Sequence, residues 1–180
     1  SAASDVYKRQ MMGRSQYMNG DFLGAASTFF YTSRHFSWLP ATVTEAKLWQ
    51  ARSYLALDWL FEAETIIVRI KPEELSNKEL KRLYYFDFAD LRLREKNYAD
   101  AVPYLVEAVK MASGTQKTRL WFLLGQVYSR LGRKTEAYQA FKKAGGASNA
   151  SYRTRFNARI KQSEVFEGAD ITPEVKALRR

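Results

Sequence analysis

Small and large apolar residues recur along this chain at helical spacing and at a longer, nearly fixed period. Four alanines lie 38, 38 and 36 residues apart: Ala25, Ala63, Ala101 and Ala137. Each is followed four residues later by a large apolar residue: Phe29, Ile67, Leu105 and Phe141. A second small residue precedes the last three alanines by twelve residues: Ala51, Ala89 and Gly125. A self-similarity of this length indicates stacked supersecondary units.

The apolar period and the turn residues together predict pairs of helices. The predicted helices span residues 11–19, 21–36, 42–57, 59–70, 76–94, 97–112, 116–131 and 134–144. Capping boxes are predicted at Thr42 with Glu45 and at Ser76 with Glu79, and Asn97 is a third predicted cap. The connection over residues 71–76 is the longest, and it explains part of the excess over a 34-residue period.

The fourth unit has the most complete signature. Its residues follow the order W-x2-L-G-x2-Y and then A-x3-F: Trp121, Leu124, Gly125, Tyr128, Ala137 and Phe141. This order closely resembles the tetratricopeptide repeat, although Asn149 stands where that repeat has its closing proline. The resemblance covers about residues 11–165. It implies an all-α fold, a right-handed α-solenoid of about four helix pairs, with residues 152–166 as the first helix of a partial fifth.

Packing explains these residues without any cofactor. Small residues allow paired helices to approach closely, and the large ones fill the space against the next unit. Because a single unit cannot bury its own apolar face, we interpret Trp121, Tyr128 and Phe141 as core. The chain is therefore predicted to be non-enzymatic and to bind no cofactor, metal or small-molecule substrate.

The two ends differ from the solenoid, which we assign to residues 11–166. The first ten residues, SAASDVYKRQ, carry no repeat signature, and they match a reading of TCG GCA GCG TCA GAT GTG TAT AAG AGA CAG. That string resembles a transposase adapter used in preparing DNA sequencing libraries. We interpret residues 1–10 as non-native; a genuine polar arm is the alternative. Residues 167–180, with a predicted cap at Thr172 and Pro173 behind it, read as the start of a truncated further helix.

Composition narrows the candidate chemistry. The 180 residues include no cysteine, which excludes disulfides, thiolate nucleophiles and cysteine-ligated zinc. No apolar run is long enough to span a membrane. His35 is the only histidine, and no second histidine or cysteine can share a metal with it. Asp87 and Asp90 lie one helical turn apart, but we expect solvation, or pairing with Arg52 or Arg94, rather than acid–base work.

Solenoids of this kind curve, and the first helix of each unit lines the concave wall. Aligning the four units places an arginine-rich set with interleaved aromatic residues on that wall. The predicted wall consists of Arg14, Tyr17, Leu48, Arg52, Leu55, Phe86, Asp90, Arg94, Arg119, Phe122, Gln126 and Arg130, continued by Arg155 and Arg159. Arginine forks and aromatic anchors favour peptide recognition, and the formal net charge of +10 favours an acidic or C-terminal protein segment. The alternative is a solvated face whose arginines have partners on their own helices.

These features predict a scaffold that binds other proteins. One alternative is an accessory segment of a larger secretion component or enzyme. A basic nucleic-acid-binding solenoid is a second alternative, opposed by the spread of basic residues over several helices. The runs at residues 117–128 and 155–160 also resemble repeat arrays of Bacteroidota outer-membrane lipoproteins associated with gliding motility and type IX secretion. That resemblance implies a periplasmic, lipid-anchored scaffold in a cell-envelope assembly; a cytoplasmic location is the alternative.

Overall fold

The computed structural model describes residues 1–145, and within them it contains eight α-helices, one short 3-10 helix and no strand. The predicted all-α class is confirmed. The helices are α1 (Ala2–Met18), α2 (Phe22–His35), α3 (Pro40–Ala56), α4 (Leu60–Ile67), η1 (Pro72–Glu74), α5 (Lys78–Arg94), α6 (Tyr98–Met111), α7 (Gly114–Arg130) and α8 (Lys134–Gly145). The predicted fifth-unit helix at 152–166 and the segment 167–180 lie outside the described residues.

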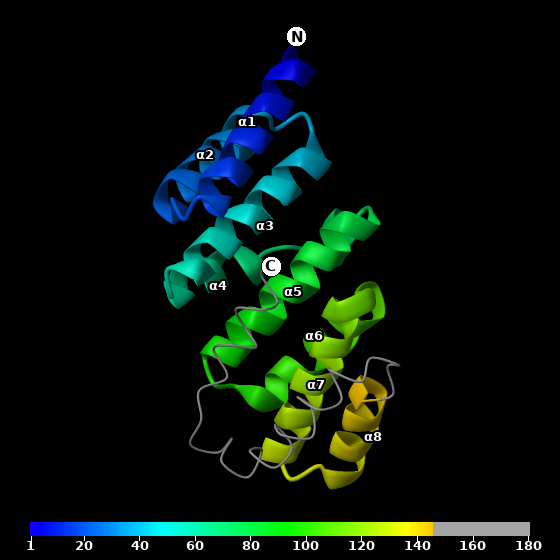
Figure 1. Ribbon diagram of the computed structural model, residues 1–180. Coiled ribbons are helices and arrows are strands. Elements are labelled where there is room, and N and C mark those ends of the chain that lie inside the picture. Colours follow the sequence, from blue (N-terminus) through cyan, green and yellow to red (C-terminus); the bar gives the residue numbers. More distant parts are fainter. Residues whose placement is uncertain (146–180) are drawn as a thin grey trace. The chain divides into compact units, whose positions relative to one another are not determined.

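The chain divides into two compact units, and the division falls within α5, between Leu91 and Arg92. In unit 1, α2 packs against both α1 and α3, and α3 also packs against α4 (Figure 1). Unit 1 has a continuous apolar core in which Phe29, Leu48 and Leu83 are fully buried. Helices α1 to α4 therefore pack in sequence, as the period predicted, because each buries its apolar face against a neighbouring helix.

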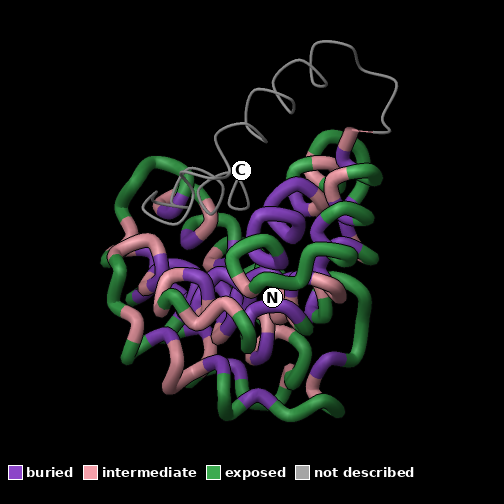
Figure 2. Tube along the Cα trace, turned by 90° about the horizontal axis from the view of Figure 1, so that it is seen from below, coloured by how far each residue is buried: buried purple, intermediate pink, exposed green. Residues whose placement is uncertain are grey.

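Unit 2 shows the same arrangement in α6, α7 and α8, where α7 packs against both others. Ala101 in α6 and Ala137 in α8, two of the recurring alanines, are buried. Phe122 lies 5.7 Å from Phe141 between ring centroids, and both pack with Ala144. Buried and exposed positions alternate along the helical part of the chain, as expected for helices with one buried face (Figure 2).

Two glycines hold equivalent places in the first and fourth repeats of the sequence period. A Cβ atom at Gly13 would lie 2.6 Å from the ring of Phe29, and one at Gly125 would lie 2.5 Å from the ring of Phe141. Such distances are far shorter than a van der Waals contact, so a side chain would not fit at either position. The absence of a Cβ atom lets each helix pack closely against its partner. Gly13 precedes Ala25 by twelve residues. It therefore completes the pattern of small residues, which had been found in the last three repeats only.

The first helix begins earlier than expected. α1 starts at Ala2, not residue 11, and the buried side of the helix continues through Val6 and Gln10. The predicted start was wrong because the first ten residues were set aside before their apolar spacing was considered. Nothing in the fold tests whether residues 1–10 are native, so that interpretation stays a prediction.

Two of the three predicted caps were wrong. α3 begins at Pro40, two residues before Thr42, because proline has the right φ for a first helical turn. At α5 the cap is Asn77 instead of Ser76: the Oδ1 atom of Asn77 accepts a hydrogen bond of 2.9 Å from the Leu80 amide. The predicted cap at Asn97 is confirmed, since its Oδ1 atom accepts from the Asp100 amide.

The corrected cap at α5 gives a direct test. We expect Asn77→Ala to lower the free energy of unfolding by about 1 kcal/mol, because the Leu80 amide loses its acceptor. Ser76→Ala, one residue earlier, serves as the control and is expected to change stability by less than about 0.5 kcal/mol. Chemical denaturation followed by far-ultraviolet circular dichroism measures both. A larger loss for Ser76→Ala would restore the cap predicted from the sequence.

Candidate partner-binding surface

The structure distributes the predicted wall residues over three environments. The buried ones are Tyr17, Leu48, Arg52, Leu55, Phe86, Asp90, Phe122 and Gln126. Arg14 and Arg94 are partly exposed, and Arg119 and Arg130 are exposed. Arg155 and Arg159 lie outside the described residues. The surface that a partner can reach without rearrangement is thus much smaller than the predicted wall, and it is formed by arginines.

Leu48 and Leu55 on α3 are core residues, with no exposed surface. Their prediction as wall residues was wrong, because a repeat alignment gives the direction of a side chain but not the depth at which neighbouring helices cover it. Leu48 belongs to the same apolar cluster as Phe29 and Leu83. Both leucines therefore contribute to stability and are not available to a partner.

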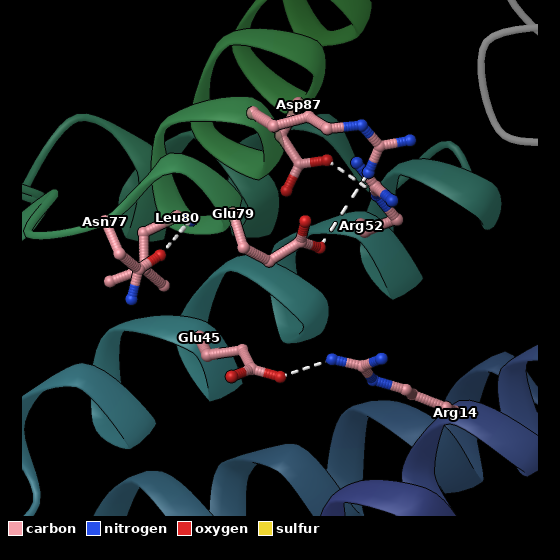
Figure 3. A network of polar contacts seen from close by, with 8 residues as sticks. Arg14, Glu45, Arg52, Asn77, Glu79, Leu80 and Asp87 are labelled. Carbon is pink, nitrogen blue, oxygen red and sulfur yellow. Dashed lines mark hydrogen bonds and ion pairs between the residues drawn. The ribbon is translucent and has the colours of Figure 1, made fainter. Parts of the chain in front are cut away.

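A buried ion pair connects α3 to α5 within unit 1. The Nε atom of Arg52 donates to Oδ1 of Asp87 at 2.8 Å, and these side chains are 10% and 2% exposed (Figure 3). Burial lowers the pKa of Arg52, but the charge and hydrogen bond of Asp87, helped by Tyr17 and Asp90, outweigh this effect and raise it. The expected pairing of Asp87 with Arg52 is confirmed, and the bond holds the carboxylate in a structural role.

Trp49 lies at the centre of the polar and aromatic contacts of unit 1. The guanidinium carbons of Arg14 and Arg52 are each 5.1 Å from the centre of its ring system. The ring of Tyr17 meets it edge-on at 5.5 Å, and Phe29 stacks on it at 5.7 Å. These contacts fix the positions of both arginines through cation–π attraction.

Arg14 is the accessible member of this cluster. It pairs with Glu45 of α3, and the two side chains are 34% and 26% exposed (Figure 3). The sequence did not predict Glu45 as the partner of Arg14, nor Trp49 as the ring beside it. Their spacing of one turn on α3 was the available signal, since residues four apart share a helix face. The Arg14 guanidinium is thus oriented at the surface, but its charge is already matched.

In unit 2, α7 carries the predicted wall residues along one face. Arg119, Gln126 and Arg130 are spaced i, i+7 and i+11, which places them in one stripe about 16 Å long. Gln126 is 6% exposed, and among the residues described no donor reaches its Oε1 atom. The Arg130 guanidinium lies 5.2 Å from the ring centre of Tyr98 on α6. The stripe therefore has an exposed cation at each end and a buried amide acceptor between them.

Arg133, in the turn before α8, is occupied within the chain. Its Nε and Nη2 atoms donate to the two carboxylate oxygens of Glu136 at 2.7 and 2.6 Å. The hydrogen bond from Arg133 lowers the pKa of Glu136, and burial followed by the charge of Glu136 raises the pKa of Tyr128. We therefore do not include Arg133 in the candidate surface.

Other candidate chemistry has no geometric support in residues 1–145. No group of three or more histidine, cysteine, aspartate or glutamate side chains there is arranged to hold a metal ion. His35 is exposed at the end of α2, where its ring stacks on Tyr31 at 3.7 Å between centroids. None of the described helices combines the length and the apolar character needed to cross a membrane.

Comparison with known protein families gives a match to one repeat of this chain. A tetratricopeptide repeat model matches residues 118–146, which begin within α7 and include all of α8. The comparison with curated proteins found no match. The match and the all-helical architecture together support a tetratricopeptide-repeat protein. Repeats of this family generally mediate protein–protein interaction, and their fold is typically a non-enzymatic scaffold.

Proposed function

We propose that this chain is a non-enzymatic scaffold that binds a segment of another protein along the first helix of its repeats. The observation that carries the proposal is the α7 stripe, which lies in the segment matched by the repeat family. Arg119 and Arg130 are exposed there, at the two ends of the stripe, and Gln126 between them is buried. An extended acidic peptide offers carboxylates to the guanidinium groups, which lie about 16 Å apart on one exposed face of α7.

Charge favours an acidic or C-terminal segment as the ligand. The chain carries 29 Lys and Arg against 19 Asp and Glu, so its field attracts anionic partners over a distance of about one Debye length. Electrostatic attraction thus brings the segment in, and the two exposed arginines, one at each end of the stripe, orient it.

A screen of random peptides displayed with free C-termini tests this proposal. We expect the chain to enrich acidic sequences, and Arg119→Glu or Arg130→Glu to weaken binding of the enriched peptide about tenfold or more. Lys142→Glu on α8 is the matched control, since it makes the same change in net charge at an exposed position of the same unit. Equal losses in all three variants would show a nonspecific charge effect and contradict a site on α7.

Nucleic acid is the competing ligand, because α7 also places Arg130 beside the aromatic ring of Tyr98. Mixed-sequence DNA and RNA are therefore titrated at two salt concentrations. Tighter binding of nucleic acid than of any enriched peptide, steeply weakened by salt, would overturn the protein-scaffold proposal.

The narrower envelope-lipoprotein assignment rests on sequence resemblance alone. One of its two runs, residues 117–128, is largely the repeat signature itself, and the other lies outside the described residues. A periplasmic assembly thus stays a prediction.

A further inference from the structure

Two pairs of exposed apolar residues recur in unit 1 at the period of the repeat. On α2, Leu23 and Phe30 are 54% and 47% exposed; at positions 38 residues later, Phe61 and Val68 are 79% and 50% exposed. Each pair is spaced i, i+7. Leu23 and Phe30 lie within α2, whereas Phe61 lies in α4 and Val68 is its C-cap, which keeps a helical φ and ψ, so the members of each pair share one face about 10 Å apart. Large apolar side chains so exposed at equivalent places form a candidate interface.

The α4 pair lies away from the core. Ala63 and Ile67 form the buried face of α4, each with no exposed surface. Helical spacing of 100° per residue places Phe61 and Val68 on roughly the opposite side of the helix. The stacking of repeats within unit 1 therefore leaves this face uncovered.

Charge distinguishes the α4 pair from its α2 counterpart. Glu62 follows Phe61 in α4, and Arg69 follows Val68 in the turn directly after the helix. Both are exposed, and neither forms an ion pair with any residue in the described part of the chain. The corresponding residues beside the α2 pair are Gly24 and Tyr31, which carry no charge. The α4 face thus has a negative end and a positive end with an apolar residue beside each.

We propose that the outer face of α4 binds the same face of a second copy of this chain, with the two helices antiparallel. A two-fold axis near the middle of α4 brings Glu62 of each copy beside Arg69 of the other. It also packs Phe61 of each copy against Val68 of the other. The charge pattern matches itself only in this orientation, because a parallel arrangement places like charges together.

Charge reversal with rescue provides the test. Glu62→Arg alone and Arg69→Glu alone each place like charges across the two-fold axis, and we expect either to weaken dimerisation about tenfold or more. The double variant Glu62→Arg with Arg69→Glu restores opposite charges and is expected to dimerise like the wild type. Sedimentation velocity over a wide range of concentration measures the dissociation constant.

Apolar variants separate the two faces. Phe61→Ser is expected to abolish the dimer, whereas Phe30→Ser at the equivalent place on α2 is expected to leave it unchanged. Circular dichroism confirms that each variant stays folded. A wild type that remains monomeric at the highest concentration, a dimer equally weakened by Phe30→Ser, or a double variant without rescue would each overturn the proposal.

Discussion

Replacing Arg52 by alanine is expected to lower the free energy of unfolding of unit 1 by about 3–5 kcal/mol. The guanidinium is the hydrogen-bonded partner of Asp87, whose side chain is only 2% exposed. Without the arginine, the buried carboxylate loses the cation that donates to its Oδ1 atom, so its charged form becomes more costly. Denaturant unfolding followed by circular dichroism measures the loss.

Two further variants isolate the cause. Arg52→Met combined with Asp87→Leu removes both charges and keeps most of the volume, so we expect it to recover most of the stability lost in Arg52→Ala. Arg14→Ala removes the partly exposed partner of Glu45 and is expected to cost about 1 kcal/mol or less. Equal losses for Arg14→Ala and Arg52→Ala would contradict the role assigned to burial.

Phe29→Ala is expected to have a loss of similar size, about 3–5 kcal/mol. The ring is fully buried, lies against the backbone at Gly13 and stacks on Trp49. Truncation removes the ring that packs on Gly13 and leaves a cavity, because the glycine has no side chain that could fill the space. The measurement is again the change in unfolding free energy.

The neighbouring phenylalanine is the matched control. Phe30 is 47% exposed, so Phe30→Ala removes the same atoms with little cavity and is expected to cost less than about 1 kcal/mol. Comparable losses at Phe29 and Phe30 would show that the recurring large residue is not a core residue in the first unit. That result would undermine the reading of the whole period.

The helix pairs could be predicted because each small residue of the period must lie at a close helix contact. The same rule applies to Gly13, which lies twelve residues before Ala25 and inside the predicted helix 11–19, but the spacing was followed in the last three repeat units only. Cap positions were harder, because Ser76 and Asn77 are both good caps and a one-residue shift of the helix decides between them. Local propensity alone does not resolve such a choice.

For the candidate surface, the sequence predicts the helix face on which a residue lies but not how deeply neighbouring helices bury its side chain. Helical spacing placed Arg119 and Arg130 on one face of α7, where both are exposed. It gave Leu48 and Leu55 the same status, although α3 packs against both α2 and α4 and these side chains are buried. Pairing with Arg52 was one of the alternatives expected for Asp87, although the same pattern placed Arg52 on the wall; the structure shows the pair in a buried position. The aromatic support from Trp49 was not expected, since it depends on side-chain packing between helices.

Mapping a bound peptide on the chain tests the central claim most directly. Amide correlation spectra of the isotope-labelled chain are recorded with and without the peptide most enriched in the screen. The account predicts that the largest shifts lie on α7, around Arg119, Gln126 and Arg130, and that the outer face of α4 is unaffected. Shifts confined to other helices, or none at a saturating concentration of peptide, would contradict a binding surface on the first helix of the repeat.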